Sequence, residues 1–274
     1  MKISNLQNSN RKYIKSLGGF NVLEYVKDVS VSPENVVSEY YMSEMNIRRR
    51  QVVIEMDNSS VVIQAGAMQW MAGDIHGATG VKGVKDFMGK LFKGAVTKET
   101  AIMPEYFGSG LLVLEPTYKY ILLMEVARWG DMGVTIEKGM FLACDSGVTS
   151  NVVSRKNASS AIMGGEGFFN MSLSGHGIVA LESNVPQEEL IAIDLEDDVL
   201  KIDGSLAVCW STGLDFTVEK ATSSLLGSAV SGEGLVNVYR GTGRVLMCPV
   251  AATESMSSAS VSRVSDEKDD DWEE

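Results

Sequence analysis

The stretch GSGLLVL at Gly108–Leu114 occurs two more times in this chain, in altered form. It returns as GHGIVAL at Gly175–Leu181 and as GTGRVLM at Gly241–Met247, so the first glycines are 67 and then 66 residues apart. Self-similarity at a fixed period indicates a duplicated structural unit. The sequence therefore predicts a fold built from three similar modules.

The segments around these copies have the composition of β-strands. Short runs of Val, Ile, Leu, Met and Phe lie between turns rich in Gly, Asp, Asn and Ser, and their spacing favours a sandwich or barrel over alternating strands and helices. The glycines of the repeat would allow positive φ at turns or bulges. We therefore predict an all-β fold. The predicted strands are Val52–Met56, Val61–Gln64, Leu111–Leu114, Ile121–Val126, Ile178–Leu181, Ile191–Leu195, Leu206–Trp210, Val236–Tyr239 and Val245–Cys248.

The repeat and the composition divide the chain into three parts. Residues 1–19 form an N-terminal lead-in, and residues 20–250 form the β domain. Within that domain, the modules are predicted at about 20–116, 117–183 and 184–250. The remaining residues, 251–274, are Ser-rich and acidic, which predicts a disordered tail.

Charge and cysteine content narrow the class of protein. The formal net charge is −12, and −5 of it falls within residues 263–274. Because binding to nucleic acid needs a basic surface, we expect no nucleic-acid partner. The three cysteines form no C-x-x-C pair and their number is odd, which favours a reducing, cytoplasmic location. No apolar run is long enough to suggest a membrane span.

One segment, residues 81–93, departs from the strand pattern and predicts a short amphipathic helix inserted in the β fold. Its lysines fall largely outside the apolar face, so the face could meet a protein partner or a membrane surface. The interpretation we favour is a helix packed on its own β core or at a subunit interface with its lysines in solvent, because single amphipathic helices in soluble proteins usually face a core. Contact with a membrane surface is possible but not favoured. The predicted face consists of Val84, Phe87, Met88, Leu91 and Phe92.

Three glutamates precede the repeated glycines at a constant spacing. Glu99, Glu166 and Glu233 are 67 residues apart in each step. In similar modules they could form a ring of carboxylates that binds a cation, a basic peptide or a neighbouring subunit. The alternative, which we favour, is that each glutamate starts a strand beside a glycine turn.

The remaining chemically reactive residues give no pattern of catalysis or metal binding. His76 and His176 are the only histidines, lie 100 residues apart and are interpreted as turn residues. Cys144 and Cys209 occupy the same repeat position and are interpreted as small buried apolar residues. The basic cluster Arg48–Arg50 could contact phosphate or an acidic partner, but a solvated edge strand is the commoner explanation. We expect no catalytic residues, no metal and no cofactor.

The order and spacing of these segments resemble a known family. The stretch GEGFFNMSLSGHG at 165–177 and KGMFLACD at 138–145, together with the three modules, are similar to the altered-inheritance-of-mitochondria (mitochondrial biogenesis) family. The resemblance covers about residues 20–250. It implies a β-rich fold similar to the tryptophan RNA-binding attenuator protein, with internal repeats and homo-oligomers, and it supplies no catalytic residue. The segment Met42–Arg50 and the acidic tail depart from a compact member of the family.

These observations together predict a non-enzymatic scaffold or binding protein that engages a protein partner. We expect a symmetric homo-oligomer, a trimer or a higher ring, because a chain with three similar modules can continue its pseudo-symmetry between subunits. Two alternatives stay open. One is a small-ligand or RNA-binding module, by analogy of fold. The other is a metal-dependent β-barrel enzyme, although no clustered His and Glu ligands accompany it.

Overall fold

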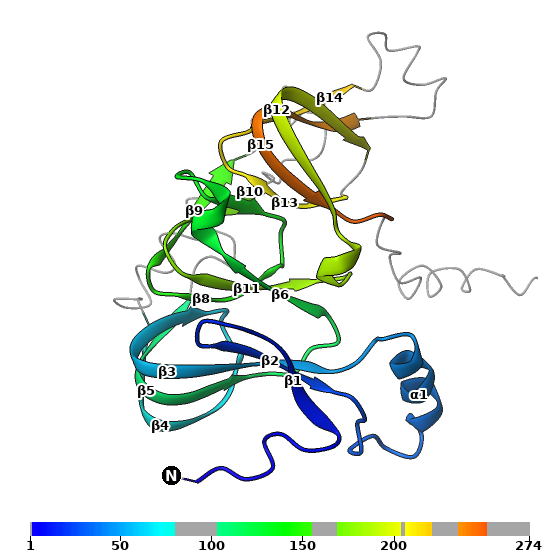
Figure 1. Cartoon of the computed structure of the whole chain (residues 1–274), viewed down its shortest axis with the longest axis vertical. Coiled ribbons are helices and arrows are strands. Elements are labelled where there is room, and N and C mark those ends of the chain that lie inside the picture. The colour runs from blue at the N-terminus through cyan, green and yellow to red at the C-terminus, as the bar shows by residue number, and fades with distance from the viewer. Residues whose placement is uncertain (1, 80–102, 155–168, 204–205, 221–234, 251–274) are drawn as a thin grey trace, which may run out of the picture.

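Strands make up most of the residues that this computed structural model describes, which are 2–79, 103–154, 169–203, 206–220 and 235–250. They form two curled sheets, one at each end of an elongated molecule (Figure 1). The first sheet has eight strands: β1 (Arg11–Leu17), β2 (Phe20–Tyr25), β3 (Arg50–Ile63), β4 (Met68–Thr79), β5 (Pro104–Leu114), β6 (Tyr120–Glu125), β8 (Phe141–Asp145) and β11 (Ile178–Ser183).

The second sheet has seven strands. They are β7 (Val134–Ile136), β9 (Val148–Ser154), β10 (Phe169–Gly175), β12 (Ile191–Asp203), β13 (Ala207–Ser211), β14 (Asp215–Lys220) and β15 (Leu235–Met247). The helical elements in the described residues are α1 (Val36–Glu44) and two short 3₁₀ helices, η1 (Val126–Trp129) and η2 (Gln187–Glu189).

All the strand pairs within these sheets are antiparallel. In the first sheet the order is β1-β2-β3-β8-β11-β6, with β5 beside β3 and β4 beside β5. In the second sheet the order is β12-β15-β13-β7-β10-β9, with β14 beside β15. Antiparallel pairing allows the short connections that the many turn residues of the sequence suggested.

The three copies of the GxG motif occupy two kinds of position: two lie within strands, and one lies between two strands. β5 and β15 each continue through their copy of the GxG motif. At Gly175–Gly177 the chain instead leaves β10, in the second sheet, and enters β11, in the first. Both of these glycines have positive φ, 97° and 143°, so the absence of a Cβ permits the bend. The middle of the chain thereby joins the two sheets.

Two copies of the motif sit opposite the same kind of bulge. β3 bulges at Asn58, whose backbone N–H donates to Ser109 Oγ at 2.8 Å. β12 bulges at Asp197, whose N–H donates to Thr242 Oγ1 at 3.0 Å. Asn58 and Asp197 both have positive φ, 44° and 54°, a conformation that Asn and Asp tolerate better than most residues. The middle residue of the motif therefore caps a bulge in both places.

The apolar core runs through both sheets. One cluster fills the first sheet around Ile54 and Leu112, and another fills the second sheet around Trp210 and Tyr239, whose rings lie 5.3 Å apart. A third cluster, which includes Leu122 of the first sheet and Leu173 of the second, connects them. The two sheets therefore share buried surface.

The all-β prediction is confirmed, as two curled sheets. The nine predicted strands correspond to seven observed ones, to within one residue beyond their ends, because β3 and β15 each unite two of them. Residues 1–19, predicted as a lead-in, contain β1. The division into three modules stays a prediction, and the helix predicted at residues 81–93 lies outside the described residues. α1 is a helix that the sequence analysis did not predict.

Candidate functional site: helix α1 and its anchor

Most of the predicted site residues cannot be placed. Glu99, Glu166 and Glu233 lie outside the described residues, and so does the predicted apolar face of Val84, Phe87, Met88, Leu91 and Phe92. Both hypotheses stay predictions. The candidate site below comes from a different part of the chain, the connection between β2 and β3.

Arg50, the first residue of β3, is the anchor of this connection. Its side chain is only 2% exposed, and its Nη2 lies 2.8 Å from Oε2 of Glu24, whose side chain is 9% exposed. The Arg50 guanidinium also lies 4.1 Å from the centre of the Tyr120 ring and donates from Nη2 to the Asn46 carbonyl at 3.0 Å. A charge this deeply buried persists only when it is paired and hydrogen-bonded, as it is here.

The prediction of a solvated edge strand at Arg48–Arg50 is therefore wrong. β3 is paired on both sides, with β2 and β8 along one edge and β5 along the other. Arg50 turns inward to meet Glu24, a residue far away in sequence whose position the local pattern does not reveal. The side chain of Arg50 is therefore paired within the protein and does not face solvent.

Arg48 and Arg49 complete the anchor. Arg48 Nη1 lies 3.3 Å from Glu24 Oε1, and Arg49 Nε lies 3.1 Å from Asp28 Oδ2. Burial acts to raise the pKa of Asp28, but hydrogen bonds from Ser30 and the positive charge of Arg49 outweigh it and hold that pKa below its usual value. The carboxylate of Asp28 is thus kept charged opposite Arg49.

Helix α1 is held by polar contacts at its edges. Tyr118 Oη donates to Glu39 Oε1 at 2.6 Å, Tyr120 Oη donates to the Asn46 carbonyl at 3.1 Å, and Arg48 Nε donates to the Ser43 carbonyl at 3.2 Å. The helix has nine residues and no side-chain cap at its N-terminus. Because isolated helices of this length are marginal in water, these contacts must stabilise it.

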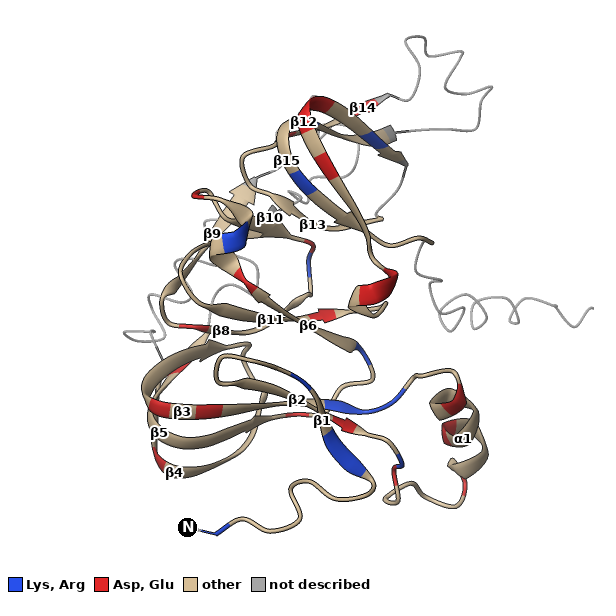
Figure 2. Cartoon of the chain, in the orientation of Figure 1, with Lys and Arg blue, Asp and Glu red and all other residues tan. Residues whose placement is uncertain are grey.

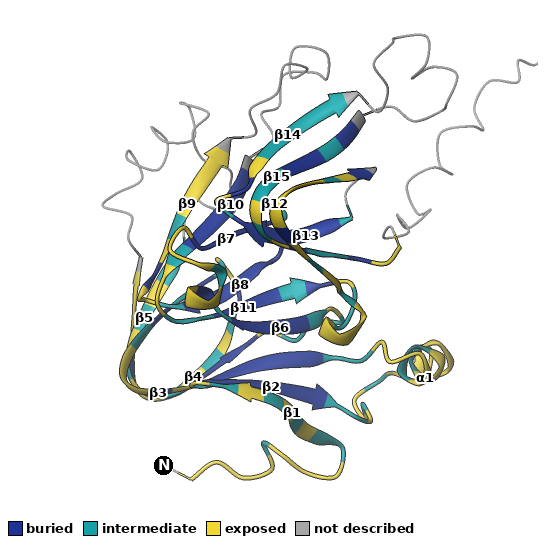
Figure 3. Cartoon of the chain, turned by 45° about the horizontal axis from the view of Figure 1, so that its top comes forward, coloured by how far each residue is buried: buried dark blue, intermediate teal, exposed yellow. Residues whose placement is uncertain are grey.

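No residue of α1 is buried. The helix projects from the side of the first sheet, and Figure 3 shows it exposed or half-buried along its length beside strands that are largely buried. Apart from the half-buried Met42, its apolar side chains are exposed, with Tyr41 at 65% and Met45, just after the helix, at 74% exposed. The rings of Tyr40 and Tyr41 pack edge to face, 5.5 Å apart. Val36 and Val37 extend the same surface.

The charges on α1 have one sign. The helix contains Glu39 and Glu44 and no basic residue, and in Figure 2 the only charged residues on it are acidic ones, in red. Between α1 and the sheet lies a groove of about 290 Å³, whose walls include Tyr25, Val31, Val36, Tyr40 and Ile47. Below we call Val36, Val37, Tyr40, Tyr41 and Met45 the α1 surface.

A signal for this helix was present in the sequence. Val37, Tyr41 and Met45 recur at intervals of four residues after Pro33, which is the spacing of one helix face. Neighbouring Val36 and Tyr40 broaden the apolar stripe, so that helix and strand patterns overlap. The Arg50–Glu24 pair had no comparable signal.

The cysteine predictions are confirmed, and the histidine predictions are confirmed only in part. Cys144 and Cys209 are buried, and burial raises the pKa of both thiols, that of Cys144 to about 12. His176 lies in the bend between β10 and β11, as expected. His76 instead lies within β4, where its Nε2 is 2.9 Å from Asp74 Oδ1, so its assignment to a turn is wrong.

The described residues contain neither a metal-binding cluster nor a helix that could span a membrane. No group of three or more His, Cys, Asp and Glu side chains is placed there so that it could hold a metal ion. Within the same residues, no helix is long and apolar enough to cross a membrane.

The fold and the site define an all-β protein of two joined, curled sheets with one projecting, acidic and apolar helix. Residues 44–250 match the family described as mitochondrial biogenesis AIM24, and the chain belongs to this family. The resemblance drawn from the sequence is thereby confirmed. The matched residues begin at the last residue of α1, so nearly all of the helix precedes them.

A solved structure supports the fold. The crystal structure of a protein from Streptococcus pyogenes is similar over 74% of this chain and 89% of its own length, with 24% sequence identity and a TM-score of 0.54. At this identity the likeness shows the fold alone. No curated protein matches the chain.

Proposed function

We propose that this chain is a non-catalytic binding protein that engages a protein partner through the α1 surface. One observation carries the proposal: α1 is ordered and anchored by a buried ion pair, yet none of its own residues is buried. A helix that packed on its own domain would turn an apolar stripe toward the core. No apolar side chain of α1 is buried in the core, although Val36 and Tyr40 line the groove beside the sheet.

The side chains of the α1 surface are those that partner proteins commonly bury. Tyr and Met are enriched at the centres of interfaces, and Tyr is frequent among the residues that contribute most to affinity. An amphipathic helix that docks into a groove uses side chains at intervals of three and four residues, as Val37, Tyr41 and Met45 are spaced. Because Glu39 and Glu44 are the only charges on α1, the complementary partner has an apolar groove bordered by Lys or Arg.

Site-specific photo-crosslinking tests this proposal. A photo-reactive amino acid is placed at position 41 of the full chain in its native cells, and in a control at position 132, where Met132 is 61% exposed in the η1–β7 connection. We expect position 41 to crosslink one protein whose purified form binds the chain through a basic-rimmed apolar groove. No crosslinked protein, or the same protein captured equally at position 132, would contradict the proposal.

We also propose that the chain acts as a homo-oligomer. Several strands are hydrogen-bonded on one side only in the described residues, among them β4 and β9. β4 exposes Met71 and β9 exposes Val152 and Val153, so both edges are apolar as well as unpaired. Such edges favour pairing with another chain.

Native mass spectrometry of the full chain measures this assembly. We expect one closed oligomer, a trimer or a higher ring, at micromolar concentration. Lys substitutions at Val152 and Val153 should shift it toward monomer, because charge on an edge strand opposes pairing. A wild-type chain that is monomeric throughout would overturn the proposed assembly and leave the α1 proposal standing.

A further inference from the structure

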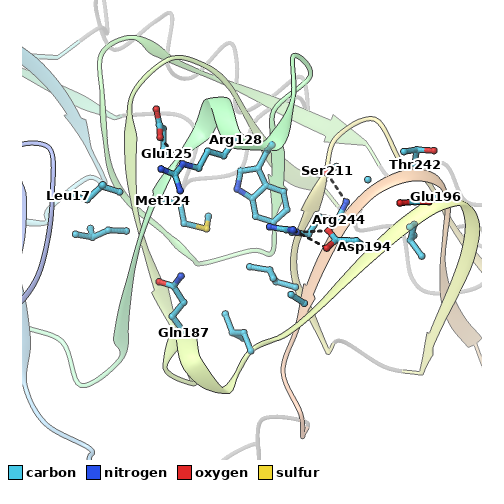
Figure 4. Close-up of a pocket in the computed structure, with 17 residues that line it drawn as sticks. Leu17, Met124, Glu125, Arg128, Gln187, Asp194, Glu196, Ser211, Thr242 and Arg244 are labelled. Atoms are coloured by element: carbon cyan, nitrogen blue, oxygen red, sulfur yellow. Dashed lines mark hydrogen bonds and ion pairs between the residues drawn. The ribbon is translucent and has the colours of Figure 1, made fainter.

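A second hollow, separate from α1, lies where the two sheets meet. It has a volume of about 700 Å³, and its walls come from the first sheet, η1, η2, β12 and β15 (Figure 4). This volume is within the range of small-molecule sites, which often lie at the junction of structural units. We call it the inter-sheet cleft.

Two ion pairs from different elements lie in the walls of the cleft. Arg244 of β15 is directly opposite Asp194 of β12, with Nε–Oδ1 at 2.6 Å and Nη2–Oδ2 at 2.9 Å. On the side of η1, Arg128 Nε lies 2.9 Å from Glu125 Oε2. Figure 4 shows both arginines with their carboxylates around the same hollow.

The contribution of these two ion pairs to folding stability is too small to explain their presence. The side chains of Arg128 and Arg244 are 79% and 52% exposed, and exposed ion pairs contribute little to folding. What the pairs do is hold each guanidinium in one orientation. Within the described residues these bonds use Nε of Arg128 and Nε and Nη2 of Arg244, so the other N–H groups of both guanidinium groups remain available to a ligand.

The charges of the cleft are mixed and slightly negative. Its ionisable walls hold three carboxylates, Glu125, Asp194 and Glu196, against the two guanidinium groups of Arg128 and Arg244. A purely anionic ligand would meet an excess of negative charge, and a purely cationic one would leave the arginine donors unused. Glu196 makes no ion pair within the described residues, so it is the carboxylate available to a cation. The rest of the wall is mixed: Gln187, Ser211 and Thr242 are polar, and the apolar side chains include Leu17, Leu123, Met124, Leu190, Leu195 and Leu246.

We propose that the inter-sheet cleft binds a small zwitterion with an apolar substituent, which is the chemistry of a free apolar amino acid. The ligand carboxylate accepts from the unused N–H groups of Arg128 and Arg244, its ammonium group meets Glu196, and its side chain lies on the leucines. Charge-assisted bonds to guanidinium are the strong ones, so the carboxylate fixes the orientation. This site does not depend on the α1 surface.

Isothermal titration of the full-length chain tests the proposal with three probes: L-leucine, L-methionine and L-phenylalanine. Two analogues of the last probe separate its charges. Phenylalaninamide lacks the carboxylate, and 3-phenylpropanoate lacks the ammonium group. We expect at least one of the three amino acids to bind. The comparison is made between the amino acid that binds and its own two analogues, the amide and the acid without the ammonium group. Each analogue should bind at least about tenfold more weakly, because one set of charged contacts is lost.

A matched pair of variants locates the binding. Arg244→Gln removes the guanidinium in the cleft, whereas Arg240→Gln removes one on the same strand that pairs with Glu219 outside the cleft walls. We expect about a tenfold loss of affinity for Arg244→Gln and less than about a twofold change for Arg240→Gln. The proposal is overturned if none of the three amino acids binds, if the analogues bind as well as the amino acid, or if the two variants lose affinity equally.

Discussion

At the scale of single residues, Arg50 shows how burial changes what a basic side chain does. Its neighbours Arg48 and Arg49 keep partial contact with solvent, but Arg50 is enclosed between Glu24, the Tyr120 ring and backbone carbonyls. A guanidinium suits this place because it donates in several directions within one plane. The same residue fixes the start of β3 and the end of the α1 connection.

Replacement of Arg50 by Met should destabilise the chain markedly. The change leaves the Glu24 carboxylate without its closest partner, and breaking a buried ion pair in this way costs about 3–5 kcal/mol. We expect the lower end of that range, because Arg48 still reaches Glu24. Urea denaturation measures the free energy of unfolding. Arg240→Met, which removes a half-exposed pair, serves as the control and should cost less than about 1 kcal/mol. Equal losses in the two variants would contradict the role given to Arg50.

Cys144 should behave as an inert thiol. Burial, with a smaller effect of Asp145, raises its pKa from 9.0 to about 12, so the reactive thiolate is scarce at neutral pH. Since the unfolded chain ionises at the lower pKa, this thiol contributes stability below about pH 9 that is lost as the pH rises toward 12. A thiol reagent at about pH 8 should label Cys144 only after denaturation. Labelling of the native chain within minutes would show that the residue is accessible.

At this scale the buried thiols could be predicted from the sequence and the buried ion pair could not, for a physical reason. The burial of Cys144 and Cys209 followed from their place in an apolar repeat, which is local information. The fate of Arg50 depends on Glu24, which pairs with it through adjacent strands. Long-range pairs of this kind have no signature in a single stretch of sequence.

At the scale of elements, the GxG motifs explain why long strands can bend without ending. In β5, Gly108 has φ 130°, and a Cβ at this residue would overlap the backbone carbonyl of Asp74 on β4. Strands thus pass close to one another at this position. The prediction that these glycines serve turns or bulges is confirmed at the bulges opposite Ser109 and Thr242.

Gly108→Ala should therefore weaken the first sheet. The added methyl meets the Asp74 carbonyl, and the positive φ costs a residue with a side chain about 1–3 kcal/mol. Thermal and urea unfolding measure the loss. Gly213→Ala is the matched control, because its nearest neighbour would be Met132 Sδ at 3.4 Å, an ordinary contact, and we expect a change below about 0.5 kcal/mol. If both variants unfold at the same midpoint, the close approach of β4 and β5 at Gly108 does not restrict which residue the first sheet tolerates there.

Strands were predicted better than helices in this chain. Apolar runs such as Val236–Tyr239 lie in observed strands. The observed strands extend further than the predicted ones, because bulges do not interrupt the pairing. α1 was missed because its apolar residues face solvent and do not form the narrow stripe of a packed helix. The α1 surface was missed for the same reason.

At the scale of the whole molecule, the two sheets are joined by strands that divide between them. β6, β8 and β11 lie in the first sheet, and β7, β9 and β10, from the same part of the sequence, lie in the second. The core cluster that contains Leu122 and Leu173 fills the space between them. α1 and the inter-sheet cleft are consequently carried by one continuous β framework, at separate places. The sequence period predicted similar units, but periodicity alone did not reveal that the middle strands would divide.

The central claim is that α1 is a docking helix, and the affinity of the purified chain for the protein crosslinked at position 41 tests it most directly. Tyr41→Asp and Met132→Asp each add one negative charge at a similarly exposed apolar residue, so both variants should keep the fold. We expect Tyr41→Asp to weaken binding at least about tenfold, because an aromatic anchor is lost, while Met132→Asp leaves it unchanged. Equal affinities of the two variants would contradict the claim.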